Sequence, residues 1–127
     1  MSSNSGEKRR WQKKKGTNLA NNENIESLKK VLSAEFRKAE ATLKVQELEL
    51  FDRGLLMPAV NQLRYAGSHL IRTLDSSDQS KIESNLRQAI AHCQRATFDS
   101  LEVQVRYYLE HITILSGLLW ILYILRF

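Results

Sequence analysis

Proline and cysteine are nearly absent from this chain of 127 residues, which has one of each and only five glycines. With so few helix breakers, long uninterrupted helices are favoured. Runs of alternating Val, Ile and Thr, which are typical of strands, are also missing. The lone Cys93 excludes an intrachain disulfide and suits a reducing compartment. The sequence therefore predicts a single all-α domain with tails.

Motifs for metal or cofactor chemistry are missing as well. The chain has no Cys-x-x-Cys pair, no His-Glu-x-x-His pattern and no glycine-rich phosphate loop. The three histidines, His69, His92 and His111, show no paired ligand spacing. The N-terminus lacks the apolar core of a cleaved secretion signal. We therefore expect no metal, no cofactor and no secretion through a cleaved signal.

The excess positive charge is concentrated in residues 1–22. Six basic residues stand there against Glu7 alone and account for the whole net charge of +5, because the other 13 basic and 13 acidic residues cancel. The abundance of Ser, Asn, Gly and Lys predicts a disordered basic arm. Anionic lipid and nucleic acid are both candidate partners of this arm, and a solvated arm without a partner is the third interpretation. The expected anion-binding residues are Lys8, Arg9, Arg10, Trp11, Lys13, Lys14 and Lys15.

Apolar residues recur at steps of three and four along two successive stretches, which predicts two amphipathic helices. The first begins near Asn24, ends near Gly54 and carries Ile25, Leu28, Leu32, Phe36, Ala39, Leu43, Gln46 and Leu50. The second covers roughly residues 56–74, has Pro58 in its first turn, and carries Leu56, Val60, Leu63, Gly67, Leu70 and Leu74, flanked by Ala59, Ala66 and Ile71. Gly67 is expected to let a neighbouring backbone approach closely.

A third helical pattern follows a turn at residues 75–78, where Asp or Ser can cap the helix start. It carries Ile82, Leu86, Ala89, Ile90, Cys93, Thr97, Leu101, Val105 and Tyr108. A helix from there to the end of the chain is ~75 Å long, whereas the second helix is ~30 Å long. The predicted fold is thus an antiparallel helical hairpin or three-helix bundle over residues 23–110, with one very long C-terminal helix that projects beyond it.

The projecting end, residues 111–127, contains a run of 14 uncharged residues from Ile112 to Leu125. As a helix this run spans ~21 Å, against ~30 Å for the hydrocarbon core of a bilayer. Aromatic residues tolerate the membrane interface, and Arg126 can extend its charge outward. Both features reduce the difference between the length of the run and the thickness of the hydrocarbon core. Thr113, Ser116 and Gly117 form a small-residue patch suited to helix packing. The expected membrane-anchor residues are Ile112, Ile114, Leu115, Leu118, Leu119, Trp120, Ile121, Leu122, Tyr123, Ile124 and Leu125.

The leading hypothesis from these features is a non-enzymatic, membrane-associated helical protein that acts as a scaffold, an adaptor or a membrane-perturbing oligomer. It would be tail-anchored, with the helical domain facing the cytoplasm and with the basic arm assisting on an anionic leaflet. Membrane lipids and a homo-oligomeric or protein partner are the expected contacts. The alternative is a soluble cytoplasmic homo-oligomer in which the terminal runs of several chains, as in a coiled coil, form one core.

One short pattern suggests chemistry. Residues 64–69 read Arg-Tyr-Ala-Gly-Ser-His, an R-x4-H spacing that resembles the motif of HEPN ribonucleases, although Tyr65 stands where that family usually has a polar residue. The resemblance implies an all-helical, metal-independent ribonuclease in which Arg64 stabilises phosphate charge and His69 acts as acid or base. The competing interpretation is a surface arginine and a partly buried histidine. A charged face with Arg95–Asp99 and Glu102–Arg106 pairs is predicted on the third helix.

Overall fold

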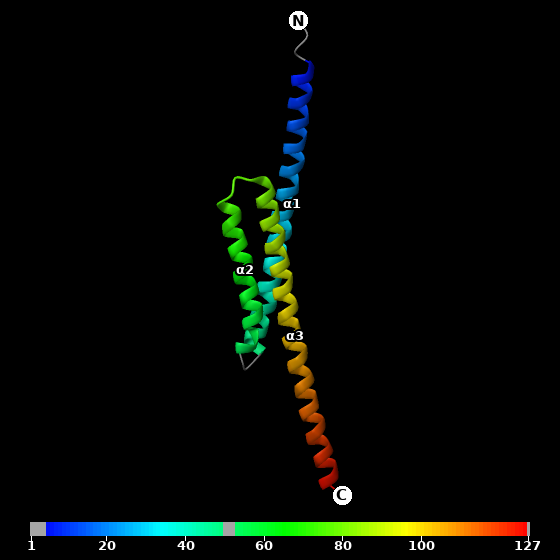
Figure 1. The fold of residues 1–127 in the computed structure, drawn as a ribbon. Helices are drawn as coiled ribbons and strands as arrows, with labels where there is room; N and C mark the ends of the chain where they lie inside the picture. Colours follow the sequence, from blue (N-terminus) through cyan, green and yellow to red (C-terminus); the bar gives the residue numbers. More distant parts are fainter. Residues whose placement is uncertain (1–4, 50–52, 127) are drawn as a thin grey trace.

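The protein is all-α, as predicted (Figure 1). The computed structural model describes residues 5–49 and 53–126, without the side chains of residues 5, 11, 14, 16–21 and 53. Helix α1 spans Ser5–Glu49, the short 3₁₀ helix η1 spans Arg53–Leu56, α2 spans Met57–Leu74 and α3 spans Gln79–Leu125. No strand occurs within these described residues.

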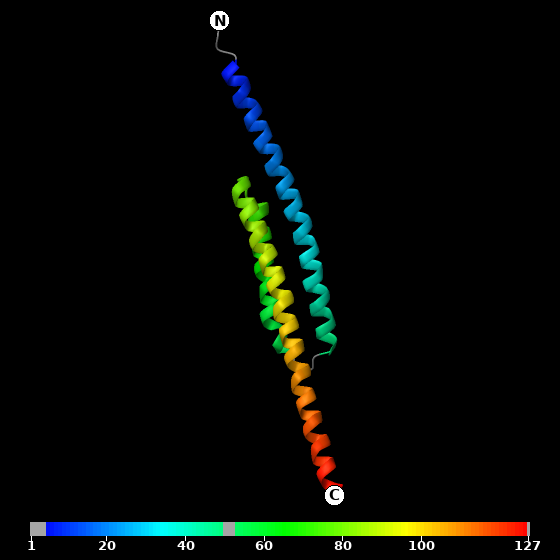
Figure 2. The same ribbon diagram turned by 90° about the vertical axis from the view of Figure 1, so that its right-hand side faces the viewer.

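The long helix α3 is the centre of the arrangement. It packs against both α1 and α2, which touch each other far less. The chain descends along α1, returns along α2 and descends again along α3, so α1 and α3 run parallel while α2 and α3 form an antiparallel hairpin (Figures 1 and 2). Because α1 and α3 are offset along the common axis, the N-terminal end of α1 and the C-terminal end of α3 project from opposite ends of the bundle.

The predicted helix starts at Pro58 and after the turn at residues 75–78 agree with the structure. Pro58 lies in the first turn of α2, where the missing N–H leaves no helical hydrogen bond unmade. Asp78 caps α3, and its Oδ1 accepts a hydrogen bond of 3.0 Å from the Ser80 backbone N–H. The turn at residues 75–78 and the hairpin between α2 and α3 are therefore confirmed.

Two hydrophobic clusters hold the bundle together. The upper cluster joins all three helices through Ile25, Leu32, Ala66, Leu86, Ala89, Ile90 and Cys93. The lower cluster contains Leu43, Leu56 and Ala59, with Val60, Leu63, Val103 and Tyr107 packed on it. Several contact positions are alanines without exposed surface, which lets the helix axes approach closely. The predicted stripe of α1 is confirmed at Ile25, Leu32, Ala39, Leu43 and Gln46.

The structure corrects the predicted contact face in the second half of the bundle. Leu101, Val105 and Tyr108 were expected inside, but they are exposed, Leu101 by 46% and Val105 by 58%. Ala96 and Ser100 take the buried positions instead, and Val103 and Tyr107 pack on the lower cluster. Small side chains at this level let α3 approach its neighbours on that face, and the larger apolar residues are left outside.

Four further positions differ from the expectation. A Cβ added at Gly67 would meet no atom within 4 Å, so no neighbouring backbone approaches there. Ile71 and Leu74, at the end of α2, are exposed, and Leu74 lines an open groove between α2 and α1. Phe36 of α1 is also exposed at the surface.

The start of α1 differs as well. Residues 1–22 were expected to be disordered and the helix to begin near Asn24, whereas α1 begins at Ser5. The packed part of α1, from Ile25 onward, supplies the nucleus that an isolated segment lacks, and each further residue then adds a hydrogen bond at small cost. Lys, Arg, Gln and Ala in this stretch have good helix propensity.

Candidate functional site

The candidate site is the part of α3 that leaves the bundle. The segment begins on α3 at the level of Glu49, which is the last residue of α1. Glu49 Oε2 accepts hydrogen bonds from Tyr108 Oη at 2.8 Å and from Gln104 Nε2 at 3.1 Å. Beyond this level neither α1 nor α2 runs alongside α3 (Figure 1). The bundle therefore ends near Tyr108, as the helix lengths predicted.

The segment beyond this limit is apolar and uncovered. All eleven predicted anchor residues of Ile112–Leu125 are exposed, with exposed fractions between 52% and 76%. By length and composition α3 could cross a membrane, and none of its most apolar 18-residue window is buried. A core helix of a soluble bundle would bury one face of such a window. This segment thus needs apolar surroundings that the folded chain does not supply.

Polar and aromatic groups in the segment suit an apolar environment. The Thr113 hydroxyl donates a hydrogen bond of 2.9 Å to the Leu109 carbonyl, so its donor is satisfied within the helix. Where α3 emerges, the Tyr107 ring lies 4.0 Å from the His111 ring and 5.9 Å from the Tyr108 ring, between centroids. Trp120 and Tyr123 stack at 5.9 Å near the far end. Aromatic residues at both ends of an apolar segment are typical of membrane interfaces.

The predicted small-residue patch lies open. Thr113, Ser116 and Gly117 are all exposed. A Cβ added at Gly117 would meet no atom within 4 Å. The patch is therefore accessible to another helix.

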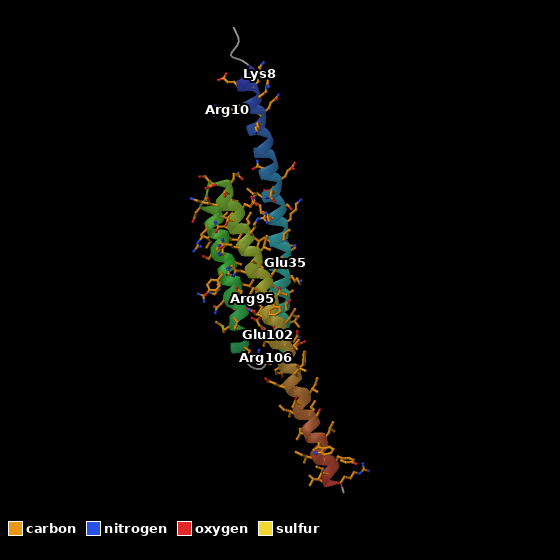
Figure 3. All side chains as sticks on the ribbon, turned by 45° about the vertical axis from the view of Figure 1, so that its right-hand side comes forward. Lys8, Arg10, Glu35, Arg95, Glu102 and Arg106 are labelled. Carbon is orange, nitrogen blue, oxygen red and sulfur yellow. The ribbon has the colours of Figure 1, made fainter. Side chains whose placement is uncertain are left out.

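The predicted anion-binding residues lie at the opposite end of the molecule. Lys8, Arg9, Arg10, Lys13 and Lys15 are exposed on the projecting part of α1, where Figure 3 labels Lys8 and Arg10. The side chains of Trp11 and Lys14 lie outside the described residues. Lys15 is about 50 Å along α1 from Glu49, at a rise of 1.5 Å per residue. This separation does not fit the expectation that arm and anchor meet one leaflet.

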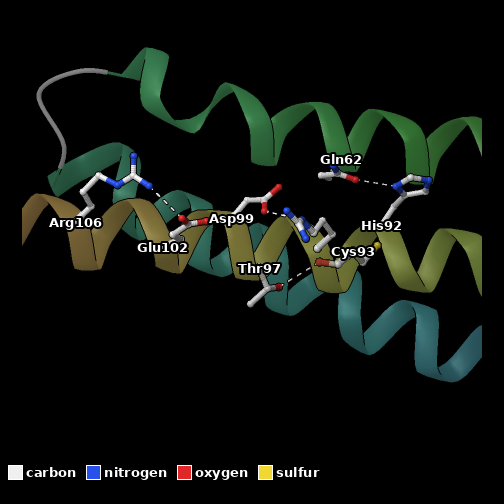
Figure 4. A network of polar contacts seen from close by, with 8 residues as sticks. Gln62, His92, Cys93, Thr97, Asp99, Glu102 and Arg106 are labelled. Atoms are coloured by element: carbon white, nitrogen blue, oxygen red, sulfur yellow. Dashed lines mark hydrogen bonds and ion pairs between the residues drawn. The ribbon is translucent and has the colours of Figure 1, made fainter.

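Histidines link α2 to α3 within the bundle. The His69 and His92 rings stack with centroids 5.3 Å apart. His69 Nδ1 lies 3.1 Å from Asn85 Oδ1. His92 Nδ1 lies 2.8 Å from Gln62 Oε1, a contact that Figure 4 shows. The pair was not predicted, because the histidines are 23 positions apart in the sequence and only the hairpin brings them together.

Arg64 has a separate partner from His69. Its Nη1 donates a 3.4 Å hydrogen bond to Asn61 Oδ1, one helical turn earlier on the exposed surface. Five residues at about 100° each separate the two side chains by roughly 140° around a regular helix. Within one chain, the two residues of the R-x4-H pattern therefore do not form a joint site.

The charged face of α3 follows the prediction. Arg95 Nε lies 2.8 Å from Asp99 Oδ1, and Arg106 Nη2 lies 3.0 Å from Glu102 Oε1 (Figure 4). Both are pairs within one helix, at a spacing of four residues. These charges therefore balance each other locally on this face.

Acidification is expected to destabilise the bundle through His92. Burial, and then the charge of His69, hold the pKa of His92 below its ordinary value, so the unfolded chain binds this proton more tightly. The free energy of unfolding should therefore be highest above about pH 6.5, the ordinary histidine pKa, and fall as the pH drops below it. Urea unfolding at about pH 7.5 and about pH 5.5 measures the difference.

His92→Gln should reduce this pH-dependent difference, because glutamine has no proton to bind. His111→Gln, at an exposed position, is the comparison, and His92→Gln should reduce the difference by more. An equal loss of stability on acidification in the His92→Gln and unmodified chains would contradict the assignment to His92.

The described residues contain no group of three or more His, Cys, Asp or Glu side chains that could hold a metal ion. Burial, and then the charge of Glu35, raise the pKa of the Cys93 thiol to about 11, so this buried thiol is a poor nucleophile.

No protein-family model, no curated protein and no solved structure matches the chain. The features of the described residues that bear on function are the exposed apolar part of α3 and the basic part of α1.

Proposed function

We propose that this protein is a non-enzymatic, membrane-associated helical scaffold, anchored by residues Ile112–Leu125 of α3. The observation that carries the proposal is the complete exposure of an apolar helical segment that no other part of the described chain covers. The bundle remains outside the bilayer and presents its basic arm at the far end. A cytoplasmic bundle is part of the proposal, supported by the free Cys93.

The leucine and isoleucine content supplies the main free-energy term that favours insertion, and Thr113, Ser116 and Gly117 partly offset it. Nine of the 14 residues are leucine or isoleucine, and at ~−0.5 kcal/mol each they contribute ~−4.5 kcal/mol on insertion scales. The segment is ~9 Å shorter than the hydrocarbon core, which costs fractions of a kcal/mol per Å. Local thinning of the bilayer and the outward reach of Arg126 reduce this cost.

Removal of residues 112–127 is expected to abolish membrane association. The full chain should pellet with membranes after carbonate extraction, whereas the shortened chain should stay in the supernatant because its remaining helices contain no comparable apolar segment. Deletion of residues 1–22 is the control, and it should leave the pelleted fraction unchanged. A full chain that behaves as a soluble monomer would refute the proposal.

A soluble homo-oligomer is the second candidate. It is favoured by the apolar spacing on α3, which is of a type that also occurs in coiled coils. Light scattering in buffer without detergent discriminates between the two candidates, since a discrete, stable dimer or tetramer would support the soluble oligomer. The ribonuclease hypothesis gains no support, because Arg64 and His69 have different partners.

A further inference from the structure

Helix α3 has a second apolar face next to the emerging segment. Phe98, Leu101, Val105 and Leu109 are all exposed and line one shallow groove, with Glu102 and Arg106 at its rim. The buried residues Ala96 and Ser100 lie on the other side of the helix, since about 100° per residue places Ser100 roughly 140° from Val105. Between residues 96 and 109, α3 therefore has one face for its own bundle and a largely exposed apolar face, which α1 flanks at Glu35 and Lys38 and where the Arg95 guanidinium lies 5.5 Å from the centre of the Phe98 ring.

The exposed face continues into the apolar segment with a regular period. Steps of three and four residues alternate without interruption through Phe98, Leu101, Val105, Tyr108, Ile112, Leu115, Leu119 and Leu122. This is the heptad spacing by which two helices pack along a common seam. All eight residues are exposed in the single chain. We call them the α3 stripe.

The rim of the stripe favours a second copy of this chain over a charged partner. Glu102 pairs with Arg106 at 3.0 Å, and Arg95 pairs with Asp99 at 2.8 Å, within the same helix. The flanking charges are thus balanced, so they neither repel an identical helix nor select one of opposite charge. A heptad stripe is also complementary to itself in parallel register.

The proposed anchoring sets the direction of pairing, and to this extent the inference depends on the proposed function. Two chains inserted in one bilayer from the same side have parallel α3 helices at equal depth. The residues of the stripe then face their counterparts, apart from Tyr108, whose hydroxyl is held by Glu49 of α1. The opposite face of α3 remains available for the bundle. We propose that two copies of this chain pair in parallel along the α3 stripe, from Phe98 to Leu122.

Cysteine cross-linking tests this pairing in the full chain reconstituted in lipid vesicles. The native Cys93 is buried in the bundle and unsuited to disulfide exchange. Leu101→Cys and Val105→Cys place a thiol in the stripe, and Glu110→Cys places one on an exposed side of the same helix. Since disulfides need Cα atoms within about 7 Å, Leu101→Cys and Val105→Cys should cross-link at least about tenfold faster than Glu110→Cys.

A second variant separates pairing from membrane insertion. Leu101→Glu/Val105→Glu puts like charges in the seam between the two α3 helices. It should abolish fluorescence energy transfer between donor-labelled and acceptor-labelled copies of the chain, while the chain still pellets with membranes. Val31→Glu/Leu48→Glu, on exposed positions of α1, is the matched control and should keep the energy transfer. Equal cross-linking at residues 101, 105 and 110, or energy transfer unchanged by the stripe variant, would overturn the pairing. Cross-linking at 101 and 105 in a chain that does not pellet would refute the anchor and leave the pairing standing.

Discussion

Leu118→Arg/Leu122→Arg is expected to release the protein from membranes. On insertion scales, replacing leucine with arginine near the centre of a membrane helix costs about 3–4 kcal/mol. Two replacements cost about 6–8 kcal/mol, which exceeds the ~4.5 kcal/mol that the leucines and isoleucines of the segment contribute. The protein should therefore move from the pellet to the supernatant after carbonate extraction.

Leu48→Arg/Leu74→Arg is the matched control. These leucines are 89% and 83% exposed, more than Leu118 and Leu122, but they lie on the bundle rather than on the emerging segment. The control makes the same change in composition and should leave the protein in the pellet. Release of both double variants to the same extent would show that general hydrophobicity, not the segment, retains the protein.

Leu86→Ala is expected to destabilise the bundle by about 2–5 kcal/mol. Leu86 is 1% exposed and belongs to the upper cluster, where it is buried together with residues of α1 and α2. Truncation leaves a cavity at the point where all three helices meet, so the loss includes both the transfer term and the cavity term. Denaturant unfolding followed by circular dichroism in mild detergent measures the effect.

Leu48→Ala provides the comparison, because Leu48 loses the same atoms at a solvent-exposed position. Its effect should stay within about 0.5 kcal/mol. A similar midpoint for the two variants would show that the upper cluster does not hold the bundle together.

The positions of the turns were predictable because their signals are local. Pro58 marks the start of α2 and Asp78 the start of α3, and each acts through its own backbone or side chain within one turn of helix. The emergence of α3 near Tyr108 was also predictable, since it follows from the lengths of the helices that cover it.

The contact face of α3 was not predictable beyond Thr97. Periodicity selects the larger apolar residues, so it favoured Leu101 and Val105 as the core. The bundle instead buries Ala96 and Ser100, whose small side chains permit close approach of the helices. Where a helix has apolar residues on two opposite faces, the sequence pattern does not distinguish the internal contact from an external one.

The candidate site was predictable to a different degree in each part. Apolarity on all sides is a property of the segment Ile112–Leu125 itself, so this segment could be identified from the sequence without knowledge of the fold. The stacking of His69 on His92 depends on the alignment of α2 with α3, and the position of the arm depends on the parallel course of α1 and α3. Both are consequences of tertiary arrangement.

The offset between the parallel helices α1 and α3 keeps the two ends of the molecule far apart. With α3 held upright in a bilayer, as proposed, Lys8, Arg9, Arg10, Lys13 and Lys15 stand about 50 Å or more above the level where α3 emerges. Electrostatic attraction in physiological salt decays over about 8 Å, so the anchoring leaflet would exert almost no pull on them. Under the proposed anchoring, the basic end of α1 therefore adds almost nothing to the binding of the leaflet that holds α3.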